Sequence, residues 1–226
     1  MSKKWGLRFS GLEQEIEKII VNYLSNSYNK SFKYVEIGAG TGRTMRGIYD
    51  IVKNNIKHDN WKVIGTDFCD GWSLDWNEVN KSFNQDELEI WTNRLSGWPF
   101  LKKLPNAQLW LDKNPRELLS DNLWFDDIDI CLIDGEHSKQ EFIKDFLAVE
   151  NNIKVEGQIW THDCGTLEEG TDFQPIGQEF INVRNAIDKL GLWEDKRSGW
   201  KFVKEILGSR YTGNGDGNAL AVFEKI

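Results

Sequence analysis

The chain has 226 residues, of which 39% are hydrophobic and 28% are charged, and its formal net charge is −8. This length and composition are typical of a globular protein, and we expect one α/β domain over residues 1–226. The negative charge argues against duplex DNA or RNA as a partner, because binding to a phosphate backbone depends on positive charge. No apolar run approaches the ~18 residues that a membrane-spanning helix needs. The basic first residues lack the apolar stretch of a secretory signal, so we expect a cytoplasmic protein without a membrane contact.

The cysteines argue against two kinds of stabilising site. Cys69, Cys131 and Cys164 are widely spaced, and the chain has no Cys-x-x-Cys pair. Structural zinc sites and disulfide frameworks usually show paired cysteines at short spacing. We therefore expect neither of them.

The first part of the chain predicts a helix, a strand, a glycine-rich turn and a second helix. Residues 11–28 carry apolar side chains at helical spacing, which predicts an amphipathic leading helix. A β-rich run begins at Lys33, and glycines at positions 38, 40 and 42 interrupt it before helical spacing resumes. A helix N-terminus offers unpaired backbone N–H groups and a partial positive charge, so it favours anionic or polar ligand groups. Glycines at such a turn let the backbone approach a ligand closely.

Two details of this turn narrow the choice of ligand. A dinucleotide-binding turn has the spacing Gly-x-Gly-x-x-Gly, but Arg43 occupies the position of its last glycine. The turn therefore does not match a pyrophosphate-binding fingerprint. Glu36 precedes the first glycine and places a carboxylate in a strand that should be buried. Such a carboxylate can accept a hydrogen bond from a ligand ammonium group, directly or through water.

Acidic residues follow the tips of the next two predicted strands. Trp61–Asp67 forms the second strand, and Asp67 can accept both ribose hydroxyls of a nucleoside, with a helix cap or turn as the alternative. Gln108–Leu111 forms the third strand and ends at Asp112, which can accept from an adenine amino group or cap the following helix. Between them, residues 71–106 form a tryptophan-rich insertion, for which a lid and a dimer contact are equally good explanations.

The second half of the chain alternates strands with helices. Ile128–Ile133 predicts an apolar strand that leads into Asp134, and Gly157–Thr161 predicts a fifth strand that leads into His162 and Asp163. The helix between them should bury one face, formed by Phe142, Phe146, Val149 and Ile153. Because alternating strands and helices form parallel sheets, the glycine turn and both acidic loops should lie at the same edge.

The last elements predict an antiparallel end to the sheet. Residues 178–190 show helical spacing, and residues 200–207 and 219–224 are β-rich. Only a short glycine-rich link joins these two runs. They should therefore form a hairpin, and one of them should run against the other strands.

The glycine turn resembles the first motif of the class I S-adenosylmethionine-dependent methyltransferases. The matching segment reads Val-Glu-Ile-Gly-Ala-Gly-Thr-Gly from Val35 to Gly42. The resemblance implies a Rossmann-like α/β fold, with a mostly parallel seven-stranded sheet, a C-terminal antiparallel hairpin and helices on both faces. It also implies S-adenosylmethionine as the cofactor. The residues that it places at this cofactor are Glu36, Gly38, Ala39, Gly40, Thr41, Asp67, Asp112 and Asp134.

Two later segments are similar to one group of these enzymes, the Methyltransferase-24 or cephalosporin-hydroxylase-like proteins with their catechol O-methyltransferase-like neighbours. Residues Ile133–Ser138 match an Ile-Asp-Gly-x-His strand end, and Lys154–Asp163 match a Lys-Pro-Gly-Gly…His-Asp-Tyr strand end. Val155 and Glu156 replace Pro-Gly, which should matter little in a β-turn. Cys164 replaces the aromatic residue and changes the wall of the expected substrate pocket.

This second resemblance implies a metal site. Asp134 and Asp163 would hold a divalent cation, and their oxygen atoms suit Mg²⁺. A cation there would lower the pKa of a substrate hydroxyl group. His137 or His162 could accept its proton, so the implied catalytic residues are Asp134, His137 and His162. The alternative is that Asp134 caps the next helix, that the histidines are structural, and that no metal binds.

The expected function is methyl transfer from S-adenosylmethionine to a hydroxyl group of a small molecule or sugar, with or without Mg²⁺. A metal-dependent hydroxylase-like enzyme and a metal-free N-methyltransferase are alternatives on the same scaffold. A partner subunit that binds the nucleoside without transferring a methyl group is another alternative. A homodimer is compatible with all of these.

Overall fold

The computed structural model describes the chain over residues 13–26, 31–39, 42–67, 104–111, 115–121, 125–164, 178–207 and 219–226. Most of the insertion predicted at 71–106 lies outside these described residues. No helix within them is both long and apolar enough to cross a bilayer.

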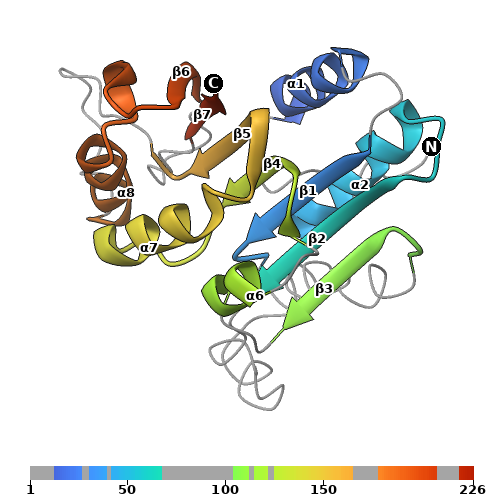
Figure 1. Ribbon diagram of the computed structural model, residues 1–226, viewed down its shortest axis with the longest axis horizontal. Coiled ribbons are helices and arrows are strands. Elements are labelled where there is room, and N and C mark those ends of the chain that lie inside the picture. Colours follow the sequence, from blue (N-terminus) through green and yellow to red (C-terminus); the bar gives the residue numbers. More distant parts are fainter. Residues whose placement is uncertain are drawn as a thin grey trace, which may run out of the picture.

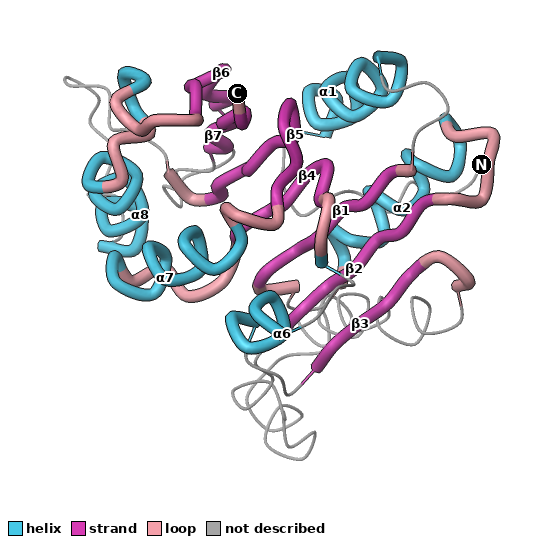
Figure 2. Tube along the Cα trace, viewed as in Figure 1, coloured by secondary structure: helices cyan, strands magenta, loops and turns pink. Residues whose placement is uncertain are grey.

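One sheet of seven strands runs through the molecule. The strands are β1 (Phe32–Ile37), β2 (Trp61–Asp67), β3 (Ala107–Leu111), β4 (Ile128–Ile133), β5 (Ile153–His162), β6 (Trp200–Leu207) and β7 (Ala219–Lys225). Their order in the sheet is β3-β2-β1-β4-β5-β7-β6. Neighbours from β3 to β5 are parallel, whereas β7 runs antiparallel to both β5 and β6. Figure 2 shows the strands as a row between the helices. The predicted mostly parallel sheet with an antiparallel C-terminal hairpin is confirmed.

Helices cover both faces of this sheet, as predicted (Figure 1). They are α1 (Glu13–Asn26), α2 (Arg43–Asn55), α6 (Pro115–Asp121), α7 (Lys139–Val149) and α8 (Gln178–Lys189), with a short 3-10 helix at Trp193–Asp195. Strand β4 shows how the two layers form. Its Ile130 and Leu132 join the core under α1 and α2, while Cys131 and Ile133 join the core under α6, α7 and α8. Side chains alternate between the faces of a strand, so a continuously apolar strand supplies both cores.

The start of β5 differs from the prediction. Ile153 is the first residue of β5, and α7 already ends at Val149. Ile153 is nevertheless buried in the same core as the apolar face of α7. The helical spacing therefore predicted the burial of Ile153 correctly, but the helix ends before this residue and β5 begins at it.

The segment after Ile153 is a bulge within β5 and not the β-turn that we expected. Ile128 pairs with Ile153, but Ile130 pairs with Gln158, so β5 carries extra residues between these pairs. Glu156 in this bulge has φ 64, a left-handed conformation that favours glycine. The replacement of glycine by Glu156 therefore matters for the backbone.

Candidate active site

The carboxyl ends of the central parallel strands bring three predicted segments together. Ile37 at the end of β1 pairs with Thr66 in β2 on one side and with Ile133 in β4 on the other. The ladder continues one step further, because Asp134 N donates to Ile37 O at 2.9 Å. The glycine turn, Asp67 and Asp134 therefore lie at one edge of the sheet.

Glu36 is held from within its own strand. Its side chain is buried, with 1% of the residue exposed, and the Tyr34 hydroxyl donates to Glu36 Oε2 at 3.0 Å. Burial, followed by the charge of Glu36, raises the pKa of Tyr34 well above its usual value, so this hydroxyl keeps its proton. The two residues are two positions apart and share one face of β1. That spacing could have identified Tyr34 from the sequence, although the prediction did not include it.

The glycine turn is anchored by its backbone. Gly38 N and Ala39 N both donate to Thr66 O, at 2.9 and 3.0 Å. Gly42 then adopts a left-handed conformation at φ 70 and caps α2 without a side-chain hydrogen bond. The predicted cofactor residues Gly40, Thr41 and Asp112 lie outside the described residues, whereas Asp67 at the tip of β2 is described and buried.

Gly38 is required for a reason that the sequence did not reveal. It has φ 82, and a Cβ on it would lie 2.3 Å from Asp134 O and 2.5 Å from Gly135 Cα. Both contacts are with backbone atoms, which cannot swing away as a side chain could. The glycine therefore lets the loop after β4 pack against the turn after β1, and it positions Asp134 beside that turn.

Asp134, His162 and Asp163 form a tight polar cluster at this edge. One ligand atom from each residue lies within 4.8 Å of the others. His162 Nδ1 is 2.9 Å from Asp134 Oδ1 and 3.2 Å from Asp163 Oδ1. His137 lies alongside, with its Nε2 3.2 Å from Asp163 Oδ2 and 3.6 Å from Asp134 Oδ1. The structure thus brings all four predicted catalytic and metal residues together.

The two histidines differ in their electrostatic environment. Burial by itself lowers the pKa of His162, but the carboxylates of Asp134 and Asp163 outweigh it and raise this pKa to about 10. His162 therefore carries a proton on Nδ1 near neutral pH. A hydrogen bond to Asp134 raises the pKa of His137, against the effect of its burial. The His137 side chain is 30% exposed, compared with 7% for His162, so His137 is the histidine that an incoming molecule can reach.

The structure argues against the alternative in which Asp134 caps α7. The N-cap of α7 is Ser138, whose side chain accepts a hydrogen bond from Glu141 N at 3.3 Å. Ser138 and Glu141 show the spacing of a capping box. The Asp134 carboxylate instead faces His162 and His137.

The loop that carries Asp163 is held by an arginine that the sequence did not single out. Asp163 has φ 56, which a residue other than glycine adopts at a cost of about 1–2 kcal/mol. Arg184 on α8 donates to Cys164 O at 3.1 Å and to Glu205 Oε1 at 3.2 Å. No local pattern links Arg184 to this loop, because the contact joins segments that are distant along the chain.

The donor atoms of the cluster fit a divalent cation. Two carboxylates suit Mg²⁺, which prefers oxygen ligands and retains several waters. An imidazole nitrogen from His162 would shift the preference towards transition metals, and His162 would have to release its Nδ1 proton to bind one.

Solved structures resemble the chain in fold over most of its length. The O-methyltransferase TomG from Streptomyces achromogenes, solved with S-adenosylmethionine, superposes with a TM-score of 0.56 and 10% identity, over 95% of this chain and 79% of TomG. The chain has the fold of the class I methyltransferases. A candidate caffeoyl-CoA O-methyltransferase from Staphylococcus aureus has a TM-score of 0.54 and 16% identity, over 94% of this chain and 83% of its own.

The class I methyltransferase fold does not by itself fix the methyl acceptor. A candidate rRNA methylase from Clostridium thermocellum also superposes, with a TM-score of 0.54 and 11% identity over 96% of both chains. No protein-family model matches the chain, and no curated protein sequence matches it either.

Proposed function

We propose that the chain is an S-adenosylmethionine-dependent methyltransferase that acts on a hydroxyl group of a small molecule or sugar. The observation that supports this most directly is the convergence of Glu36, Asp67 and the Asp134–His162–Asp163 cluster at one edge of the sheet. Ligands of open parallel α/β sheets bind at the carboxyl ends of the strands. One end of this edge suits a nucleoside, and the cluster suits an activated hydroxyl.

In this proposal, buried carboxylates bind the cofactor. Glu36, oriented by Tyr34, accepts from the ammonium group of the methionine part, directly or through water. Asp67 accepts from the ribose hydroxyls, as an acid at the tip of the second strand does in related nucleotide sites. Gly40, Thr41 and Asp112 remain predicted contacts, and so does Asp134, whose backbone is already packed against the glycine turn.

The cluster then prepares the acceptor. The hydroxyl oxygen attacks the methyl carbon, the C–S bond breaks, and its electron pair stays on the sulfur of S-adenosylhomocysteine. His137 accepts the hydroxyl proton, because it is more exposed than His162. His162, already protonated between Asp134 and Asp163, orients both carboxylates. Positioning of the acceptor against the methyl group supplies much of the rate enhancement.

Asp134 and Asp163 are the residues that would hold a divalent cation, with His162 as a further ligand or as the group that such a cation displaces. A bound cation lowers the pKa of a coordinated hydroxyl group. We therefore include a dependence of the reaction rate on a divalent cation in this proposal.

A methyl-transfer assay with S-adenosylmethionine labelled on its methyl group tests the function. Hydroxylated acceptors (catechols, phenolic acids and monosaccharides) should be presented beside the matching amines, each with Mg²⁺ and with a chelator. We expect label in a hydroxylated acceptor and a lower rate with chelator. Label only in amines would contradict the choice of acceptor, and label in none would contradict methyl transfer to acceptors of this kind.

A further inference from the structure

The imidazole of His162 is held in place by the sheet. His162 is the last residue of β5, and its backbone pairs with Leu220 of β7. Its side chain is only 7% exposed. A buried ring at the end of a paired strand has little room to turn away, because its surroundings are close-packed. A cation that enters the cluster therefore meets this ring and does not push it aside.

The ring presents one nitrogen atom to both carboxylates of the cluster. His162 Nδ1 lies 2.9 Å from Asp134 Oδ1 and 3.2 Å from Asp163 Oδ1. Ligands at right angles around an ion with bonds of ~2.1 Å are roughly 3.0 Å apart, so both spacings suit one nitrogen and two oxygen ligands. The Nδ1 proton of the imidazolium occupies this same place, and an ion that binds there displaces it.

The charge of the cluster also suits a dication. Asp134 and Asp163 bring two carboxylates together, and their side chains are only 7% and 13% exposed. Burial makes an uncompensated charge costly. A dication beside a neutral His162 ring balances both carboxylates without a proton on either histidine of the cluster.

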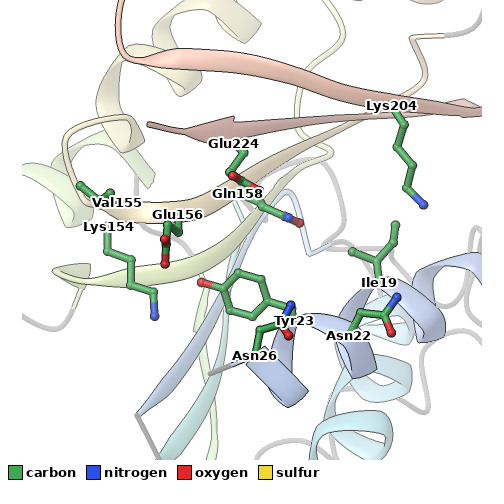
Figure 3. Close-up of a pocket in the computed structure, with 10 residues that line it drawn as sticks. All are labelled: Ile19, Asn22, Tyr23, Asn26, Lys154, Val155, Glu156, Gln158, Lys204 and Glu224. Carbon is green, nitrogen blue, oxygen red and sulfur yellow. The ribbon is translucent and has the colours of Figure 1, made fainter. Parts of the chain in front are cut away.

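The polar cavity near the other end of β5 shows the contrast (Figure 3). It has a volume of about 530 Å³ and lies between α1 and the first half of β5. Each charged side chain that lines it has an opposite charge nearby: Lys154 has Asp129, Glu224 and Glu156 have Lys201, and Lys204 has Glu15. The charges of that cavity are balanced within the chain, so they do not call for an ion.

An imidazole ligand changes which ion the cluster prefers. Mg²⁺ takes oxygen ligands and keeps several waters, whereas imidazole suits first-row transition metals such as Fe²⁺, Ni²⁺ and Zn²⁺. We propose that His162 ligates the ion through Nδ1, and that it thereby makes the site select a first-row transition-metal dication over Mg²⁺. This inference rests on the proposed function and names the class of its ion. Three protein ligands leave room at the ion for water and for the acceptor hydroxyl, as in catalytic metal sites.

Titration of the full chain with Co²⁺ and with Mg²⁺ measures this preference. Visible absorption follows Co²⁺, and competition against Co²⁺ gives the affinity for Mg²⁺. We expect Co²⁺ to bind about 100-fold more tightly than Mg²⁺, because only Co²⁺ gains from the nitrogen ligand. Equal affinities, or no binding of either ion, would overturn the proposal.

His162→Gln distinguishes a ligand from a residue that only supports the loop. The variant keeps a polar side chain but loses the imidazole, so it should bind Co²⁺ about 100-fold more weakly and Mg²⁺ nearly as well as the unaltered chain. His137→Gln is the matched control, because His137 Nε2 faces the other oxygen of Asp163, Oδ2, at 3.2 Å. This control should keep the preference for Co²⁺. Equal losses for both ions in His162→Gln would show a supporting role and overturn the proposal.

Electron spin echo spectroscopy of bound Mn²⁺ identifies the ligand even if His162→Gln does not fold. An imidazole ligand couples its nitrogen to the Mn²⁺ spin, and ¹⁵N labelling of the three histidines changes that coupling. We expect the coupling in the unaltered chain and in His137→Gln. A Mn²⁺ spectrum without nitrogen coupling would overturn the proposal.

Titration with S-adenosylhomocysteine separates this inference from the proposed function. A chain that binds it, but whose ion has no nitrogen ligand, would contradict this inference and leave the proposed methyl transfer standing. A chain that holds the ion through nitrogen but binds no S-adenosylhomocysteine would support the ligand assignment and contradict the proposed function.

Discussion

The backbone of Asp134 lies directly against Gly38, so close that a Cβ on Gly38 would be 2.3 Å from Asp134 O. This contact joins the glycine turn after β1 to the polar cluster after β4. The cofactor part and the acceptor part of the proposed site are thus one packed unit.

Gly38→Ala should therefore destabilise the protein by more than the cost of placing alanine in a left-handed conformation. The left-handed conformation costs an L-residue about 1–2 kcal/mol, and displacement of the Asp134 loop adds to that. Gly199→Ala is the matched control, since Gly199 has φ 80 but nothing within 4 Å of its added Cβ. Urea unfolding of both variants should show the larger loss for Gly38→Ala. Equal losses would show that the contact with Asp134 does not matter.

Asp163→Asn should abolish binding of a divalent cation and leave cofactor binding nearly intact. Asparagine tolerates the left-handed backbone, so the loop should keep its shape while losing a charge. Calorimetric titration with Mg²⁺ and with Mn²⁺ measures the first effect, and titration with S-adenosylhomocysteine measures the second. Asp195→Asn, at another left-handed aspartate with φ 53, should change neither. Persistent cation binding in Asp163→Asn would remove Asp163 from the metal site.

Arg184→Met should lower cation affinity about tenfold, because residues that orient metal ligands typically contribute 10–100-fold. Arg184 does not touch the cluster, so it acts by holding Cys164 O and the adjoining Asp163. Arg184 pairs with Glu205 and lies over the Trp193 ring. Arg197→Met is the control, because Arg197 likewise pairs with Glu150 and lies over the Phe146 ring in another part of the fold. Both variants should melt earlier, but only Arg184→Met should lose cation affinity, and Arg184→Lys should recover part of it.

Acidification should stabilise the protein through Asp145. Burial raises the pKa of Asp145 to about 6, and the guanidinium of Arg116, 2.9 Å away, only partly offsets it. The folded state then holds this proton more tightly than the unfolded state, so the stabilisation is present at low pH and is lost as pH rises through about 6. Between about pH 7 and pH 5, the unaltered chain should gain about 1 kcal/mol relative to Asp145→Asn. Urea midpoints at both values measure it, with exposed Asp188→Asn as the control; a constant difference would contradict the shifted pKa.

The sequence predicted the sheet well because each strand carries its own signal. The bounds of β2, β4 and β6 agree with the runs of β-rich residues at 61–67, 128–133 and 200–207. Parallel strands then place Asp67, Asp134 and Asp163 at one edge without further information. The predicted start of β5 was wrong because Ile153 is buried in the same core as α7, so its position continues the helical spacing of the apolar residues in α7.

The supporting contacts could be predicted less well. The contact of Tyr34 with Glu36 could have been predicted, since side chains two residues apart lie on the same face of a strand. The contact of Arg184 with Cys164 O could not, because it depends on how α8 packs beside β5. The left-handed conformation of Glu156 could not be predicted for a similar reason. It depends on the register between β4 and β5, which no local sequence pattern determines.

The central claim is that the edge formed by the glycine turn, Asp67 and Asp134 binds S-adenosylmethionine. Calorimetric titration of S-adenosylhomocysteine into the chain, with Mg²⁺ and then with a chelator, tests it most directly, with Asp67→Ala in parallel. We predict micromolar binding in both conditions, a severe loss in Asp67→Ala, and no change in Asp188→Ala. No binding in either condition would contradict the cofactor assignment and the proposed function with it, and equal binding by Asp67→Ala would remove the ribose contact.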